Sequence, residues 1–228
     1  MLNHSSPVPS PRMRRWALPV VAVGLATAAS ACSSATGSGD LRTESRDVGG
    51  FSAIELLGSG DVIIEQDGTE SLSVEAEDNL LPDLTSDVSD GTLQLGTVDG
   101  VSLKPTRAIT YRVTVKDLAG VQLSGSGSVT ASGITTPAIS IDISGSGDVS
   151  IDGTADDQAV AISGSGNYRA GDLATLTSSA AISGSGNVSV DVRDAFESEI
   201  NGSGNVTYTG SPRISQDISG SGELRRGE

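Results

Sequence analysis

The chain has 228 residues, with 29 acidic side chains, 14 Lys and Arg, a single His and a single Cys. Aromatic residues make up only 3% of the sequence, so a core must be built from Val, Ile, Leu and Ala. An acidic surface of this kind repels phosphate backbones and anionic headgroups, which argues against nucleic-acid binding.

The N-terminus has the pattern of an export signal. Three arginines between residues 12 and 15 precede an apolar stretch over residues 16–29, which is too short to span a bilayer as a stable helix. The stretch ends in Ala29-Ser30-Ala31-Cys32, which is a small-x-small cleavage site and also resembles the bacterial lipobox, although Ala29 stands where a larger residue is usual. We therefore predict a signal peptide over residues 1–32, lipidation at Cys32 and an extracytoplasmic protein anchored to the cell membrane. Simple secretion is the alternative, and Met13 is an alternative start.

Cleavage before Cys32 changes the composition of the mature chain. It removes the only His, at position 4, and leaves 29 acidic and 11 basic residues, a formal charge of 11 − 29 = −18. The mature chain then lacks the residues for Ser-His-Asp or Cys-His catalysis and for a zinc site. The Ser- and Gly-rich stretch that follows predicts a flexible linker over residues 33–44, and residues 45–228 form the predicted domain.

A repeated Gly-Ser-Gly motif dominates the rest of the sequence. It begins at residues 58, 125, 145, 164, 184, 202 and 220, and the last six copies are 20, 19, 20, 18 and 18 residues apart. Aliphatic residues alternate on both sides of each copy, as in Ile141, Ile143, Val149 and Ile151, which indicates strands with one buried face. The predicted structural residues are the two glycines of each copy, namely Gly58, Gly60, Gly125, Gly127, Gly145, Gly147, Gly164, Gly166, Gly184, Gly186, Gly202, Gly204, Gly220 and Gly222.

Each copy is expected to be a strand, a glycine corner and a second strand. Glycine fits corner backbone angles that a Cβ would forbid. One copy of 18–20 residues matches one coil of a parallel β-helix, with about nine coils stacked at about 4.8 Å from residue 41 onward. The fold prediction is all-β, a single-stranded parallel β-helix.

The residue after each corner suggests a ladder across the coils. This column contains Asp61, Ser128, Asp148, Asn167, Asn187, Asn205 and Glu223. Asn amides can hydrogen-bond from coil to coil, whereas neighbouring carboxylates would repel, so we expect a side-chain ladder. The alternative is the ordinary preference of Asn and Asp for turns after glycine.

Both ends of the repeat region differ from its middle. Strand-like segments over residues 71–77, 92–95 and 109–115 alternate with Asp-Gly turn signals at positions 67, 90 and 99. Residues 80–84 are expected to form a corner that packs on the coils. Toward the C-terminus, polar residues replace some of the aliphatic residues that flank the Gly-Ser-Gly copies. The last coil is also charged, which should discourage further strand pairing.

Several of these features resemble a known family. The segment Arg46–Ile54, with Phe51 at its centre, leads into the first Gly-Ser-Gly copy, and Asp90-Gly91-Thr92-Leu93 and the serial copies follow. Together they resemble the auto-transporter adhesin "head GIN" domain of exported bacterial proteins and lipoproteins, over about residues 45–226. The resemblance implies a right-handed parallel β-helix with an adhesin-like role, and it brings no catalytic residues.

The function prediction is a surface protein with a non-catalytic adhesin-like, binding or structural role. Partners would be the membrane through lipidated Cys32 and an unidentified glycan or envelope protein. A polysaccharide-acting β-helix enzyme is the first alternative, but the carboxylates are scattered and Arg169, Arg193 and Arg213 lie at different distances after their corners. A self-assembling envelope module, a homo-oligomer, is the second alternative. We expect no cofactor, and Ca²⁺ is kept as an alternative because the motif is partly like that of calcium β-rolls.

Overall fold

The computed structural model describes residues 33–227, which form an all-β domain. It contains strands and one 3₁₀ helix, η1 (Leu81–Asp83), and no α-helix among the described residues. In that same part of the chain no helix is long and apolar enough to cross a membrane.

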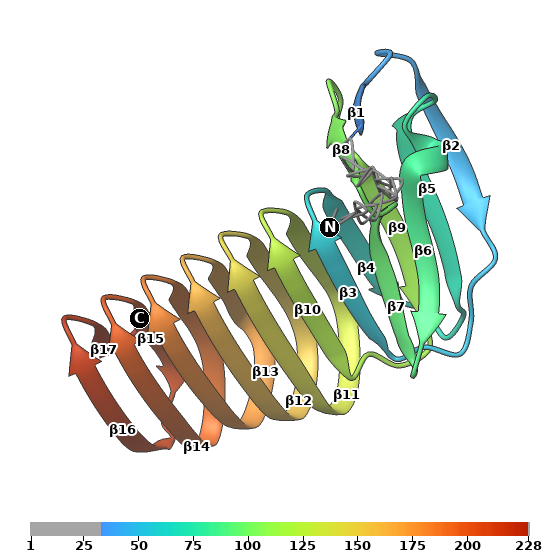
Figure 1. Ribbon diagram of the computed structural model, residues 1–228. Coiled ribbons are helices and arrows are strands. Elements are labelled where there is room, and N and C mark those ends of the chain that lie inside the picture. The colour runs from blue at the N-terminus through green and yellow to red at the C-terminus, as the bar shows by residue number, and fades with distance from the viewer. Residues whose placement is uncertain (1–32, 228) are drawn as a thin grey trace, which may run out of the picture. The chain divides into compact units, whose positions relative to one another are not determined.

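The C-terminal half is a parallel β-solenoid of about five turns, drawn from green to red in Figure 1. Its strands are β10 (Gly120–Gly125), β11 (Ser128–Gly145), β12 (Asp148–Gly164), β13 (Asn167–Gly184), β14 (Asn187–Gly202), β15 (Asn205–Gly210), β16 (Arg213–Gly220) and β17 (Glu223–Arg226). The long strands β11 to β14 each pair in parallel with the next, and most contain a register shift where the chain bends. The predicted parallel solenoid is therefore confirmed.

The seven Gly-Ser-Gly corners stack in a single column. The first glycine of each corner pairs with that of the next coil, from Gly58 to Gly220. Backbone amides then bond across neighbouring corners, as from Ser165 N to Gly145 O at 2.8 Å. The repeat spacing therefore sets the coil length.

The aliphatic columns beside the corners line the interior. Ile143, Ile162, Ile182 and Ile200 are each at most 1% exposed. Packing of these side chains supplies most of the stabilising free energy in coils whose interior is mainly aliphatic. The last coil is different: Ile214 and Ile218, at inward positions of β16, are 40% and 36% exposed.

The N-terminal half does not continue the coils, so the expectation of about nine coils from residue 41 is wrong. The strands here are β1 (Ser33–Thr36), β2 (Leu41–Arg46), β3 (Ala53–Gly58), β4 (Asp61–Gln66), β5 (Ser71–Glu77), β6 (Leu84–Ser89), β7 (Thr92–Thr97), β8 (Val101–Lys104) and β9 (Thr110–Val115). β3 and β4 pair with β10 and β11 as one coil. Their other edges pair in parallel with β7 and β9, which come later in the chain.

Antiparallel strands then end the stack on this side. β6 pairs with β7, and β5 pairs with β9 and with β2. The Asp90-Gly91 turn reverses the chain between β6 and β7, with φ of 51° and 76° at its two residues. The β6–β7 hairpin and the antiparallel pairs of β5 stand in place of glycine corners here, which is why the repeat is interrupted. The predicted strand segments and the corner at residues 80–84 are otherwise confirmed, the latter as η1.

Residues 33–44, predicted as a flexible linker, lie folded on the domain. β1 pairs in parallel with β8, and β2 pairs along its whole length with β5. Between them the chain packs against the end of β5, where the buried carboxylate of Glu77 accepts hydrogen bonds from Gly39 N at 2.7 Å and Thr106 N at 2.8 Å. Asn79 adds a bond from its amide to Thr36 O at 2.8 Å. Composition alone suggested a linker, but these long-range side-chain contacts hold the segment in place.

Candidate functional site

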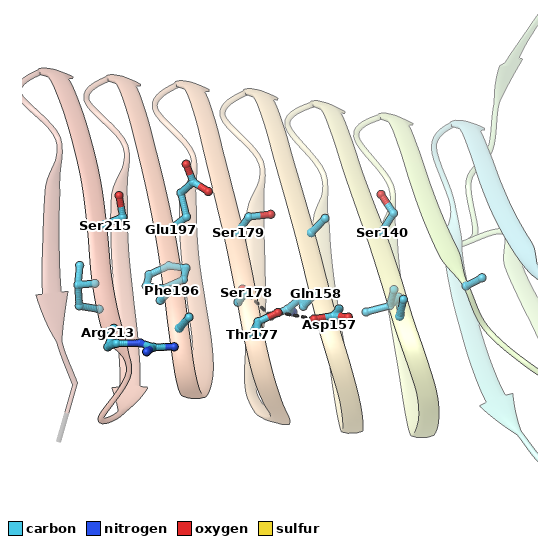
Figure 2. A pocket seen from close by; sticks show the side chains of 16 residues that line it. Ser140, Asp157, Gln158, Thr177, Ser178, Ser179, Phe196, Glu197, Arg213 and Ser215 are labelled. Atoms are coloured by element: carbon cyan, nitrogen blue, oxygen red, sulfur yellow. Dashed lines mark hydrogen bonds between the residues drawn. The ribbon is translucent and has the colours of Figure 1, made fainter.

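A groove crosses the outer surface of five successive coils (Figure 2). Its volume is about 720 Å³. It lies beside the bend of each coil. In each coil, a residue whose side chain points inward lies between two residues whose side chains point outward. Two surface rows and a floor result, and all three run in the direction in which the coils stack.

The register of the parallel strands defines these rows. The first, the Asp157 row, consists of Ala138, Asp157, Thr177, Ala195 and Arg213. The second, the Ser179 row, consists of Ser140, Ala159, Ser179, Glu197 and Ser215. The floor consists of Ile139, Gln158, Ser178, Phe196 and Ile214. Most row residues are Ala or Ser, and their small side chains leave the bend open as a groove.

The floor is polar in its middle. Gln158 and Ser178 are 3% and 5% exposed at positions where the interior is otherwise mainly aliphatic. Gln158 Nε2 donates to Tyr168 Oη at 2.5 Å, and Ser178 Oγ donates to Gln158 Oε1 at 3.1 Å. Burial raises the pKa of Tyr168, so its hydroxyl stays neutral. These bonds satisfy the buried polar atoms and hold the floor rigid beneath the groove.

The charged side chains of the groove are exposed. Thr177 Oγ1 donates a hydrogen bond to Asp157 across neighbouring coils. Among the described residues, no ion pair involves Glu197 or Arg213. The next outward row adds Asp142, Glu199 and Asp217 beside the Ser179 row. The groove and its rim therefore combine hydroxyl groups with an excess of negative charge.

The predicted side-chain ladder is present on another face. Asn205 Nδ2 donates to Asn187 Oδ1 at 3.2 Å, and Asn187 Nδ2 donates to Asn167 Oδ1 at 2.9 Å. Asn167 Nδ2 then donates to Asp148 Oδ1 at 2.7 Å. This bond and the nearby Arg169 guanidinium hold the pKa of Asp148 below its usual range. Every amide in the run points the same way, toward the carboxylate that ends it, so the ladder joins four coils.

Glycine is needed at the two ends of a corner for two different reasons. The first glycine of a corner has positive φ, +131° at Gly164, and a Cβ there would lie 2.3 Å from Gly145 O. The third residue, Gly166, has no such φ, yet its Cβ would lie 2.5 Å from Ile143 Cγ2. In the stacked coils the first position thus requires both backbone freedom and space, and the last requires space alone. The first corner differs, because a Cβ on Gly58 would meet no atom within 4 Å and Gly60 has a φ of +148°.

In residues 33–227 no three His, Cys, Asp or Glu side chains are grouped as metal ligands. Arg169, Arg193 and Arg213 lie in different rows, although Arg169 shares its row with Arg225 through Ser189 and Thr207. The lipidation site predicted at Cys32 lies outside the described residues.

The groove is not apparent in the sequence when residues are counted from the preceding Gly-Ser-Gly corner. The members of the Asp157 row lie at variable distances after their corners, because the bend absorbs insertions and deletions. Counted toward the following corner, Ala138, Asp157, Thr177, Ala195 and Arg213 all stand seven residues before its first glycine. That count brings Asp157 and Arg213 into one row and would have predicted the groove.

Comparison with known proteins supports the family suggested by the motifs. Residues 50–212 match the family described as "Putative auto-transporter adhesin, head GIN domain". The chain belongs to this family. No match was found among curated proteins.

Solved structures share the fold of this head GIN domain. A "putative adhesin" from Bacteroides fragilis aligns with a TM-score of 0.69 and 24% identity over 84% of this chain and 99% of its own. A "putative lipid binding protein" from Parabacteroides distasonis aligns with a TM-score of 0.55 and 25% identity, over 86% of this chain and 100% of its own. A "putative adhesin" from Parabacteroides merdae aligns with a TM-score of 0.54 and 21% identity, over 86% of this chain and 100% of its own.

Proposed function

We propose that this head GIN domain is an exported contact module, held at the outer side of the cell membrane by a lipid on Cys32, that binds its partner without catalysis. The observation that carries the binding role is the groove across five coils in a domain of an adhesin-like family. A rigid stack of coils presents the same kind of surface repeatedly, which suits an extended partner.

The chemistry of the groove favours binding over catalysis. A glycoside hydrolase requires two carboxyl groups on either side of one bond, one of them with a raised pKa. Asp157 and Glu197 lie in different rows two coils apart, and Asp157 accepts a hydrogen bond from Thr177. The groove therefore offers hydrogen-bonding groups and charge but no acid and base acting on a common atom.

The anchor is tested with Cys32→Ala in the native bacterium. The wild-type protein is expected in the membrane fraction, and the variant in the medium or in a soluble fraction, with the same fold. A wild-type protein that is soluble and carries no acyl chain would contradict the anchor and favour simple secretion.

The binding role is tested with Ser179→Trp, which fills the groove from an exposed position and should leave the fold intact. Cells carrying this variant should adhere more weakly to the surfaces or envelope components that wild-type cells bind. Ser183→Trp, on an exposed position beside the corner of the same coil and away from the groove and its rim, is the matched control. Unchanged adhesion by the groove variant would reject the groove as the contact surface, and cleavage of a polysaccharide by the purified protein would reject the non-catalytic role.

A further inference from the structure

We propose that the groove binds a linear glycan that carries free amino groups, laid along the direction in which the coils stack. This inference rests on the proposed function and names the chemical class of its partner. It is carried by the direction of the groove, by the polar groups that line it and by the charges around it.

The direction follows from the strand register. The Asp157 row and the Ser179 row each repeat once per coil, and coils stack about 4.8 Å apart. Four steps from the coil of Ala138 to that of Arg213 give a length of about 19 Å, which accommodates several units of an extended polymer. A compact ligand would leave most of the groove empty.

The lining selects a hydroxyl-rich polymer over a peptide strand. An added strand needs free backbone donors and acceptors at a sheet edge, but β12, β13 and β14 are paired on both sides beneath the groove, and the free edge of β16 lies only at its end. Recognition must therefore use side chains, and Ser140, Ser179, Thr177 and Ser215 supply hydroxyls at regular steps.

The charges select amines over uronic acids. Asp157 and Glu197 lie in the groove, and Asp142, Glu199 and Asp217 line its rim. Arg213, at one end of the groove, is the only opposing cation among the residues of these rows. Acidic groups gathered along a groove concentrate cations and repel carboxylates, so an amino sugar polymer is complementary whereas a uronic acid polymer is not.

The test measures binding of three oligosaccharides of equal length to the purified protein by calorimetry. They are β-1,4-linked hexamers of glucosamine, its N-acetylated form, and an α-1,4-linked galacturonate hexamer. The glucosamine hexamer is expected to bind most tightly, and raised salt should weaken it because the attraction is partly electrostatic. Equal or tighter binding of the galacturonate hexamer would overturn the proposal.

Variants separate the groove from diffuse attraction to an acidic protein. Glu197→Gln should weaken glucosamine binding several-fold, and Ser179→Trp at least about tenfold, since a factor of ten corresponds to only about 1.4 kcal/mol. Glu65→Gln is the control, because it removes the same charge from an exposed position of β4 on another face. If Glu65→Gln weakens binding as much as Glu197→Gln does, or Ser179→Trp has no effect, the attraction is diffuse and the site is wrong.

The outcomes also separate this inference from the proposed function. If Ser179→Trp reduces cell adhesion while no amino sugar oligomer binds, the groove is the contact surface but its partner has another chemistry. If neither measurement responds to Ser179→Trp, both the inference and the binding role of the groove fail. Thermal unfolding of each variant shows whether it is folded.

Discussion

A corner glycine of this solenoid is constrained by the coil beneath it. At Gly164 the backbone has φ of +131°, and the carbonyl oxygen of Gly145 occupies the place of a side chain. Neither constraint can relax locally, because the same glycine column continues above and below. Residue substitutions at the corners should therefore be judged by their distance to the next coil.

Gly164→Ala is expected to lower the free energy of unfolding by more than about 2 kcal/mol, through backbone strain together with the clash. Gly171→Ala is the control, since a Cβ there would meet only Ser189 Oγ at 3.7 Å. It should change stability by less than about 1 kcal/mol. Chemical denaturation of both variants measures the difference, and equal stabilities would mean that the corner geometry is wrong.

Ile182 tests the interior column. It is 1% exposed and pairs with Ile162 and Ile200 in the adjoining coils, so an aspartate there would be buried without a partner. We expect Ile182→Asp to cost several kcal/mol or to prevent folding. Ser183→Asp, one residue away on the exposed face between Ser163 and Asn201, should be nearly neutral. A folded Ile182→Asp protein with unchanged stability would show that the strand register is wrong.

At the scale of elements, Glu77 joins three segments that are distant in sequence. Its carboxylate bonds to Gly39, to Thr106 N at 2.8 Å and to Thr106 Oγ1 at 2.5 Å. A Cβ on Gly37 would collide with the Glu77 side chain, which shows how closely the N-terminal segment packs against it. The Glu77 carboxylate thus helps to hold the residues that precede β2, together with Asn79 and the β1–β8 pairing.

This contact predicts a dependence of stability on pH. The Thr106 hydroxyl, followed by backbone amides, holds the pKa of Glu77 below its ordinary value. A lowered pKa in the folded state contributes stability above the unfolded-state pKa of about 4.3, and that contribution is lost as the pH falls through the folded-state value. The melting temperature of Glu77→Gln should therefore be below that of the wild type at pH 7, and the two should converge as the pH falls below 4. A difference that stays constant with pH would contradict this.

At the scale of the molecule, stacking of coils leaves no place for α-helix. The described residues contain one 3₁₀ turn and otherwise strands and connections. Far-UV circular dichroism of the mature protein is expected to show a single β-type minimum. Paired minima typical of helix would contradict the fold.

The sequence determined the features that repeat with the coil. Gly-Ser-Gly spacing predicted the corner column, period-2 alternation predicted which isoleucines are buried, and the Asn and Asp column predicted the ladder. These follow from local pattern because every coil meets a copy of itself, so one coil specifies the contacts of the next. The Asp90-Gly91 turn likewise marked the β6–β7 hairpin, since turn conformation depends on neighbouring residues alone. The strands that flank Asp67-Gly68 and Asp99-Gly100 do not pair with each other.

Only the tertiary structure decided where the repeat is interrupted and which residues of different coils form the groove. β3 and β4 lie between β10 and β11 on one side and β7 and β9 on the other, although β7 and β9 follow them in the chain. Ser- and Gly-rich residues 33–44 are held by Glu77 and Asn79, some 40 residues away. The groove depends on where each coil bends, and insertions before the bend shift Asp157, Thr177 and Arg213 out of alignment in the sequence. Such features depend on contacts between distant segments, which local propensity and periodicity do not encode.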